Sequence, residues 1–106
     1  MAEIKHIVLL KFKPATTESQ IVGFFKELDG LTHKIPGLNN FIGGRYSSPE
    51  GLNQGYTHGF IMSFRDAAAR DGYLPHPEHE RVKSGIVPHV DQIVAFDFEV
   101  QGLAQK

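Results

Sequence analysis

The chain has 106 residues, which suffices for one hydrophobic core and leaves little for a second. Its 11 basic and 12 acidic residues nearly cancel, so no strong net charge directs it to nucleic acid, an anionic membrane or a highly charged substrate. The absence of cysteine excludes disulfides, thiolate nucleophiles and cysteine-bound zinc or iron–sulfur centres.

No secretory signal pattern is present, because the first residues lead directly into an alternating strand pattern without a basic segment and an apolar signal region. No stretch approaches the roughly 20 apolar residues that a membrane-spanning helix needs. We therefore expect a single soluble domain over residues 1–106, located in the cytoplasm and without a membrane partner.

Residues 4–12 alternate with a period of two and predict a strand that is apolar at the centre of both faces. One face carries Ile4, His6, Val8, Leu10 and Phe12. Thr17 followed by Gln20 is the pattern of a capping box and predicts that a helix begins there. That helix should end at Pro36. Its apolar stripe consists of Ile21, Phe24, Phe25, Leu28, Leu31 and Ile35.

Residues 38–46 predict a weaker, glycine-containing strand, and residues 47–55 are polar, turn-rich and typical of a loop. Residues 56–64 alternate again and predict a third strand. The face of this strand that is directed to the core would carry His58, Phe60, Met62 and Phe64.

A second helical segment follows and is interrupted by proline. Asp66 can cap its start, and Pro75 and Pro77 predict a break. Pro77 suits the first turn of a resumed helix that ends near Pro88. Residues 93–100 then predict the last strand, which has Val94, Phe96, Phe98 and Val100 on one face and Ile93, Ala95 and Asp97 on the other.

The order of elements, β-α-β-β-α-β, predicts an α+β domain with the ferredoxin-like fold, a four-stranded antiparallel sheet with both helices on one face. The other face would expose a contiguous apolar patch, larger than a soluble monomer normally tolerates. We therefore expect a homodimer that pairs through the helix-free face as a dimeric α+β barrel. The patch would consist of Ile7, Leu9, Ile61, Val94, Phe96 and Phe98.

Four segments together resemble the stress-responsive A/B barrel (Dabb) domain family. They are KHIVLLKF at residues 5–12, GYTH at 55–58, YLPHPEH at 73–79 and FDF at 96–98, in the order that the family has. The resemblance implies a dimeric α+β barrel with a ferredoxin-like protomer, which agrees with the fold that the residue pattern predicts. It also implies a pocket between the sheet and the helices.

By the same resemblance, two residues would be catalytic. In a plant polyketide cyclase of this family, a tyrosine and a histidine of the interrupted second helix catalyse an intramolecular aldol closure, and those positions match Tyr73 and His79. Leu28 and Val90 stand where that cyclase has aromatic side chains, so the resemblance implies a pocket rather than the same substrate. The predicted substrate-binding residues are His6, Val8, Leu10, Phe24, Phe25, Phe41, His58, Phe60, His76, Val82, Ile93 and Ala95.

The residue types fit such chemistry. Strand alternation places His6 and His58 on the helix-covered face, and an imidazole exchanges a proton near neutral pH. A tyrosine hydroxyl could donate a hydrogen bond to a carbonyl oxygen as it becomes an enolate or alkoxide. Tyr73 and His79 are separated by a helix break, so their contact follows from the resemblance and not from their spacing.

Each of these residues also has a structural interpretation. His76 and His79 flank a proline break, where histidines often cap a helix end. His6 and His58 could be core histidines with satisfied hydrogen bonds, and Tyr73 could be ordinary packing. Side chains that could be core rather than a platform for a ligand are Phe24, Phe25 and Leu28.

A divalent metal site is one alternative, since His76, Glu78 and His79 offer nitrogen and oxygen ligands. His6 or His58 could complete it from the sheet. Haem bound through a pocket histidine is another alternative. The chain lacks a P-loop, a dinucleotide fingerprint and a clustered basic patch, so we expect neither nucleotide nor nucleic-acid binding.

Two functions from different classes remain. The first is a cofactor-free cyclase or lyase of the aldol type for a small, largely apolar carbonyl or polyketide-like compound, with His79 as base and Tyr73 as hydrogen-bond donor. The second is a non-catalytic, stress-associated protein that is structural or binds a ligand. An open cavity beside Tyr73 would favour the first. A cavity filled by Phe24, Phe60 and Met62 would favour the second. Neither a cofactor nor a metal ion is predicted.

Overall fold

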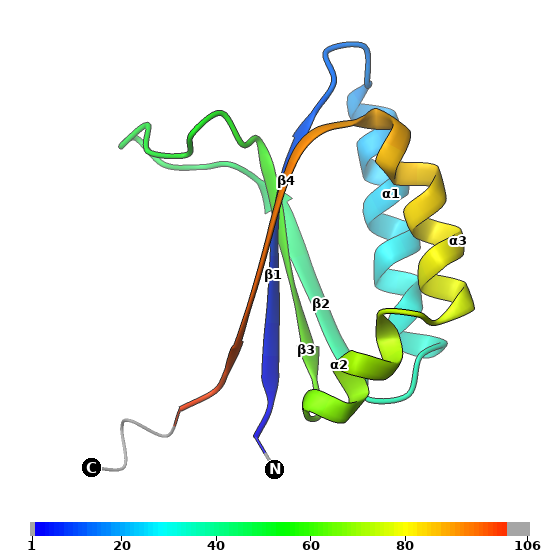
Figure 1. Ribbon diagram of the computed structural model, residues 1–106. Coiled ribbons are helices and arrows are strands. Elements are labelled where there is room, and N and C mark those ends of the chain that lie inside the picture. Colours follow the sequence, from blue (N-terminus) through cyan, green and yellow to red (C-terminus); the bar gives the residue numbers. More distant parts are fainter. Residues whose placement is uncertain (1, 102–106) are drawn as a thin grey trace.

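Residues 2–101, which the computed structural model describes, form a four-stranded sheet with helices on one of its faces (Figure 1). The strand order is β2-β3-β1-β4, and neighbouring strands are antiparallel. This is the ferredoxin-like arrangement, so the predicted α+β fold is confirmed. The strands are β1 (Ile4–Phe12), β2 (Leu38–Arg45), β3 (His58–Phe64) and β4 (Val90–Glu99). The helical elements are α1 (Glu18–Gly30), η1 (Leu31–His33), α2 (Ala67–Tyr73), α3 (Pro77–Ile86) and η2 (Val87–His89), of which η1 and η2 are short 3-10 turns.

The alternation of β1 divides its side chains between the two faces of the sheet, as predicted. Val8 and Leu10 are almost fully buried beneath the helices, whereas Leu9 between them is 39% exposed on the opposite face. Met62 and Phe64 of β3 are completely buried in the same layer as Val8 and Leu10. The hydrophobic core therefore lies between the sheet and the helices, and burial of each of its large side chains contributes about 1.5–3 kcal/mol.

Capping groups fix where the first two helices begin. The Thr17 hydroxyl accepts a hydrogen bond from the Gln20 backbone N–H at 3.1 Å, and the Gln20 side chain accepts one from the Thr17 N–H at 2.8 Å. The predicted capping box is therefore present. The Asp66 carboxylate accepts a hydrogen bond from the Ala69 N–H at 2.9 Å and caps α2, also as predicted.

Several boundaries differ from those that the sequence pattern indicates, and β3, for example, begins at His58 rather than at Tyr56. α1 ends at Gly30, and the 3-10 turn that follows still buries Leu31 and leads to a buried Ile35. The apolar stripe thus reaches the core although the regular helix has ended. β4 begins at Val90 rather than at Ile93, because its first residues already pair with β1.

The predicted break in the second helical segment separates α2 from α3. Pro75 cannot donate a backbone hydrogen bond, and Pro77 stands in the first turn of α3, where the missing N–H is tolerated. His76 caps α3, because its Nδ1 accepts a hydrogen bond from the Glu78 N–H at 3.1 Å. The chain therefore turns sharply between Tyr73 and α3.

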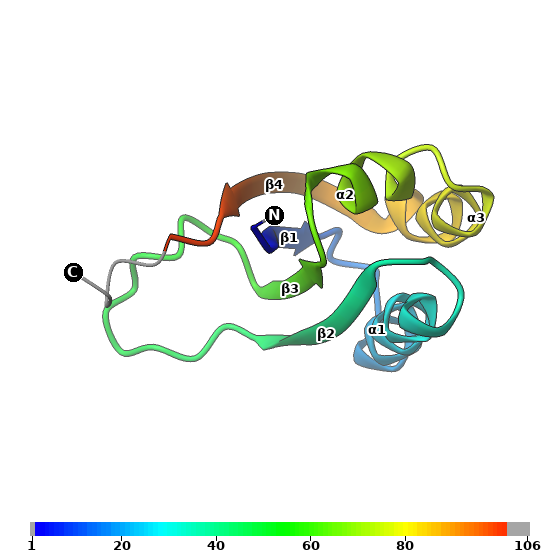
Figure 2. The same ribbon diagram turned by 90° about the horizontal axis from the view of Figure 1, so that it is seen from below.

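An apolar row crosses the helix-free face of the sheet from edge to edge. The strand register pairs Ile42 with Ile61, Ile61 with Ile7, and Ile7 with Phe96. Ile42 is 57% exposed and Phe96 is 62% exposed. Figure 2 shows that the helices of the described residues lie on the opposite side of the sheet. The residue pattern therefore predicted this apolar face correctly.

The turn at Gly37 gives a test of the fold. Gly37 has a φ angle of +83°, and a Cβ atom there would lie 2.5 Å from the Ala69 Cβ atom. We expect Gly37→Ala to lower the free energy of unfolding by about 2 kcal/mol or more, because it combines backbone strain with a clash. Urea denaturation measures the change.

Gly23→Ala is the matched control. Gly23 lies within α1, and a Cβ atom added there would have no neighbouring group within 4 Å, so the same substitution should raise the free energy of unfolding by about 0.5–1 kcal/mol. Equal effects at both positions would contradict this account of the Gly37 turn.

Candidate functional site

A cavity of about 460 Å³ lies between the helix-covered face of the sheet and the α2–α3 segment. We call it the helix-side cavity. Its walls include Val8 and Leu10 of β1, Ile93 and Ala95 of β4, and Ile86 of α3, so it is largely apolar. Its polar groups come mainly from His6, Tyr73, His79, Lys83, Asp91 and Gln92.

The helix break brings Tyr73 and His79 together. Tyr73 is the last residue of α2 and His79 lies in the first turn of α3, and their rings stack with centroids 4.0 Å apart and planes at 28°. The His79 Nδ1 atom lies 3.0 Å from the backbone oxygen of Leu74, an acceptor, so we assign the ring proton to Nδ1. Nε2 of the neutral ring is then free to accept a proton.

The surroundings of His79 favour its neutral form. Burial lowers the pKa of the imidazole, and the positive charge of Lys83 lowers it further. The hydrogen bond to Leu74 and the charge of Glu80 act in the opposite direction but do not outweigh burial. His79 is therefore suited to act as a general base at neutral pH.

Tyr73 presents a protonated hydroxyl. Its side chain is 2% exposed, and burial together with the negative charge of Asp97 raises the pKa of the phenol well above its usual value. Within residues 2–101, no protein group accepts a hydrogen bond from this hydroxyl, and no buried side-chain polar atom is left without a partner. The Tyr73 hydroxyl must therefore retain contact with the cavity, where it can donate a hydrogen bond to a ligand.

A second histidine of the cavity is held by a carboxylate. The register of β1 and β4 pairs His6 with Asp97, and His6 Nδ1 lies 2.5 Å from Asp97 Oδ1. Arg70 of α2 donates to the other carboxylate oxygen of Asp97 at 2.9 Å. Partial burial opposes ionisation of Asp97, but the hydrogen bonds from His6 and Arg70 prevail and lower the pKa of its carboxyl.

Asp97 and Arg70 were not among the predicted site residues. The His6 ring lies 5.9 Å from the Tyr73 ring, so the group of His6, Asp97 and Arg70 borders the pair of Tyr73 and His79. A signal for Asp97 exists in the sequence, because strand alternation places it on the same face as Ala95. Its pairing with His6 depends on the strand register, which the sequence pattern alone does not give.

The predicted site residues fall into separate places. Those that line the helix-side cavity are Tyr73, His79, His6, Val8, Leu10, Phe60, Ile93 and Ala95. Phe25, Phe41 and His58 instead line a groove of about 570 Å³ between α1 and β2. Phe60 lies between the two groups, with its ring 6.4 Å from His6 and 6.1 Å from Phe25.

His58 has its own polar neighbours in this groove. Its Nδ1 lies 2.8 Å from the Thr57 hydroxyl, and its Nε2 lies 3.8 Å from a carboxylate oxygen of Glu18. Burial lowers the pKa of His58, and the negative charge of Glu18 opposes this effect.

Phe24 packs between Phe12 and His89, with ring centroids 6.0 and 5.2 Å away.

The remaining predicted substrate-binding residues, Val82 and His76, line neither the helix-side cavity nor the groove between α1 and β2. Val82 is buried in the core at 4% exposure, and His76 caps α3. Met62 is completely buried, but it does not fill the helix-side cavity.

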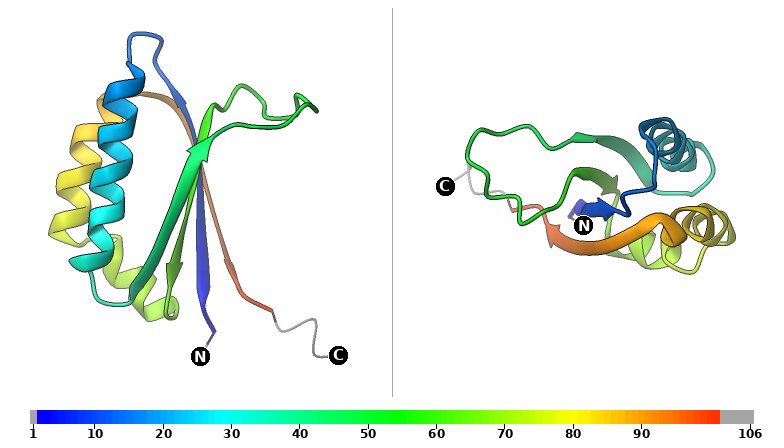
Figure 3. Two further views of the ribbon diagram at one scale, coloured as in Figure 1. Left: turned by 180° about the vertical axis from the view of Figure 1, so that it is seen from behind. Right: turned by 90° about the horizontal axis from the view of Figure 1, so that it is seen from above.

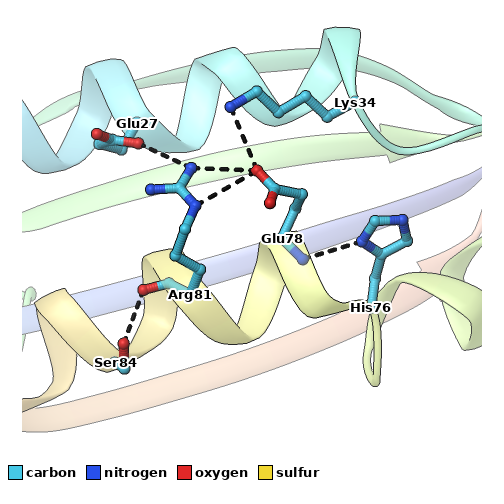
Figure 4. A network of polar contacts seen from close by, with 6 residues as sticks. All are labelled: Glu27, Lys34, His76, Glu78, Arg81 and Ser84. Carbon is cyan, nitrogen blue, oxygen red and sulfur yellow. Dashed lines mark hydrogen bonds and ion pairs between the residues drawn. The ribbon is translucent and has the colours of Figure 1, made fainter.

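A network of polar contacts holds α3 in place next to α1 (Figure 4). The Glu78 carboxylate accepts hydrogen bonds from Lys34 and Arg81, which lower the pKa of its carboxyl, and Arg81 also contacts Glu27 of α1 at 3.3 Å. These ion pairs are exposed, so each contributes little by itself to the stability of the fold. Together they join the two helices, and α3 carries His79.

The arrangement of possible metal ligands and the length of the helices can also be described. Within residues 2–101, no group of three or more histidine, cysteine or acidic side chains is arranged to hold a metal ion. Glu78, one of the alternative ligands, is engaged with Lys34 and Arg81. In the same part of the chain, no helix has both the length and the apolar character to cross a membrane.

Comparison with known proteins identifies relatives over nearly the whole chain. The model of the family named Stress responsive A/B Barrel Domain matches residues 4–100. The stress-response A/B barrel domain-containing protein At5g22580 of Arabidopsis thaliana is 35% identical over 100 residues, which cover 91% of this chain and 85% of that protein. Olivetolic acid cyclase of Cannabis sativa is 28% identical over 95 residues, or 90% of this chain and 94% of the cyclase.

Among solved structures, a dimeric ferredoxin-like protein from Jannaschia is 31% identical. The match covers 92% of this chain and 99% of that one, with a TM-score of 0.82. The hydroxynitrile lyase of Passiflora edulis shares the fold with a TM-score of 0.88 at 19% identity.

Titration of His79 tests the electrostatics of the site. We expect its ring resonances to report a pKa below about 6.5 by NMR, because burial disfavours the charged form. Lys83→Gln should raise this pKa, since it removes a nearby positive charge. A midpoint at or above about 6.5 in the unaltered protein would contradict the account.

The lowered pKa of His79 also predicts how the stability of the protein changes with pH. Below about pH 6.5 the folded protein binds fewer protons at His79 than the unfolded chain, so the free energy of unfolding should fall as the pH drops from about 7 to 5. His79→Gln should reduce this slope, and an unchanged slope in that variant would contradict the account.

Proposed function

Because the chain belongs to the stress responsive A/B barrel domain family, we propose that its helix-side cavity binds a small, largely apolar carbonyl compound of the polyketide type. We further propose that the protein is a cofactor-free cyclase or lyase that acts on this compound by aldol chemistry. The cavity volume of about 460 Å³ falls within the range of small-molecule sites, about 300–1,000 Å³. The similarity to olivetolic acid cyclase supports the same class of reaction.

One observation carries the proposal: the Tyr73 hydroxyl, which has no hydrogen-bond partner among residues 2–101, borders the cavity directly beside a neutral His79. Aldol chemistry needs a base for a carbon acid and a hydrogen-bond donor for the carbonyl oxygen that becomes an enolate. The two side chains supply these groups within one apolar cavity. An aldol closure involves no net oxidation or reduction, so a base and a hydrogen-bond donor suffice for it.

The proposed reaction keeps protons and electron pairs in balance. His79 Nε2 removes a proton from the carbon between two carbonyl groups, and the Tyr73 hydroxyl donates a hydrogen bond to the enolate oxygen that forms. The enolate carbon then forms a bond with a second carbonyl carbon of the same molecule. The oxygen of that carbonyl becomes an alkoxide and takes the proton back from His79.

The His6–Asp97 pair offers a second proton acceptor. The carboxylate holds the Nδ1 proton, so Nε2 of His6 is the free ring nitrogen. Arg70 fixes the carboxylate from the other side. We propose that this pair orients the substrate or accepts a proton in a later elimination of water.

Ligand binding without chemistry is the second candidate function. It is favoured by the hydrogen bonds that His79 and His6 already make to Leu74 and Asp97, as structural histidines do. Under this proposal the protein would bind the same class of apolar compound and release it unchanged.

We also propose that the protein is a homodimer that pairs through the helix-free face of the sheet. The apolar row of Ile42, Ile61, Ile7 and Phe96 supports this proposal, since a patch of this kind normally marks an interface. The dimeric ferredoxin-like protein from Jannaschia supports it as well.

Variants of the two proposed catalytic residues test the reaction. The purified protein is incubated with linear tri- and tetraketide thioesters, and cyclised product is measured by mass spectrometry. His79→Ala should lower the rate by about 10²–10⁴-fold, and Tyr73→Phe by about 10²–10³-fold. Tyr73→Phe should leave stability nearly unchanged, because the hydroxyl has no partner among residues 2–101.

His33→Ala is the control and should keep the full rate. Full rate in His79→Ala would refute the catalytic assignment. If the unaltered protein binds these compounds in calorimetry but converts none of them, ligand binding without chemistry is the function. If it neither binds nor converts them, the proposed substrate class is wrong.

Phe96→Asp tests the dimer. The substitution places a charge in the apolar row at its most exposed position, so we expect light scattering at micromolar concentration to show a monomer in place of a dimer. Val22→Asp on the outer side of α1, which is 52% exposed, should leave the mass unchanged. A monomeric unaltered protein would rule out the proposed homodimer.

A further inference from the structure

Residues 46–57, which connect β2 to β3, form an arm that leaves the sheet on its helix-free side (Figures 1 and 3). All views place the arm and the helices on opposite sides of the sheet. Near the middle of the arm, Leu52 is 71% exposed, the highest value for a large apolar side chain among residues 2–101. An apolar side chain therefore projects from the molecule on the side where the apolar row lies.

Hydrogen bonds within the arm support its shape. The Tyr46 hydroxyl accepts a hydrogen bond from the Gly51 N–H at 2.9 Å, and the Asn53 side chain donates to the Tyr56 backbone oxygen at 2.7 Å. Gly51 and Gly55 adopt φ angles of +70° and +85°, which glycine tolerates. Little ordering entropy would therefore be lost if the arm contacted another molecule.

The base of the arm is tied to the sheet. The Thr57 N–H donates to the Leu10 backbone oxygen at 2.9 Å, and the Tyr46 N–H donates to the Thr57 oxygen at 2.8 Å. Between the arm and the sheet lies a hollow of about 490 Å³. Its lining includes Ile7, Leu9, Ile42 and Ile61 from the sheet and Tyr46, Asn53 and Tyr56 from the arm.

The hollow continues the apolar row. Ile42, Ile61 and Ile7 belong to both, so whatever covers the row will also meet the hollow and the arm that borders it. In a twofold dimer each contact occurs twice, so the arm of each protomer would contact the other protomer. The occupant that fits these observations is a second copy of the chain.

We propose that the arm clasps the partner protomer, with Leu52 packed against the partner's surface. This inference rests on the proposed homodimer and adds the element that secures it. The apolar row supplies the buried area, and the arm extends the interface beyond the plane of the sheet. An apolar side chain that is buried on binding contributes affinity in proportion to its area.

Photo-cross-linking tests the clasp in the full chain. A benzoylphenylalanine is placed at position 52 and, as the control, at position 22 on the outer side of α1. Irradiation should give a covalent dimer from position 52 in high yield and none above background from position 22. The cross-linked peptide then identifies the surface that the arm contacts.

A second measurement gives the contribution to affinity. Leu52→Ser should weaken dimerisation by roughly tenfold, as measured by dilution in analytical ultracentrifugation, while Val22→Ser should not change it. If the unaltered protein is a dimer but position 52 gives no more cross-linking than position 22, the clasp is wrong and the dimer stands. If the unaltered protein is a monomer, the proposed dimer itself fails.

Discussion

The register of β1 is the constraint on which the rest of the structure depends. β1 lies between β3 and β4, and its side chains alternate between the helix-covered face and the helix-free face. His6 is thereby placed opposite Asp97 in the core, and Ile7 is placed in the apolar row on the other side. A slip of one residue would expose the side chains of β1 that are now buried and would bury those that now lie on the helix-free face. Core, cavity and apolar row therefore all follow from one pairing.

The proline break between α2 and α3 places the rings of Tyr73 and His79 next to each other. A continuous second helix would carry Tyr73 and His79 on a rigid cylinder at a spacing of six residues, which places them on different sides of the helix. Pro75 and Pro77 divide the segment, so the chain turns and the two rings stack. The turn also exposes the Leu74 carbonyl group, which holds His79 Nδ1. Backbone geometry thus sets both the position of the imidazole and its tautomer.

Local sequence signals predicted the elements well, because a capping box, a proline and strand alternation act within a few residues. They predicted the faces of His6, Ile7 and Leu9 for the same reason. The partners of a side chain are different, because they depend on which strands pair and in which register. The contact of Asp97 with His6 is of this kind, and no local pattern contains it. The family resemblance grouped Phe25, Phe41 and His58 with the cavity, whereas the structure places them in the α1–β2 groove beyond Phe60.

The two faces of the sheet are coupled through β4. This strand lies at an edge of the sheet and pairs only with β1 among the described strands. Its alternate residues lie on opposite faces of the sheet. Ala95 lines the cavity and Asp97 contacts the cavity residue His6, whereas Phe96 between them belongs to the apolar row. Edge strands have fewer hydrogen bonds and open more readily than central ones. A partner that covers Phe96 would therefore also hold the strand that positions the Asp97 carboxylate, so the proposed dimer would stabilise the His6–Asp97 contact on the other face.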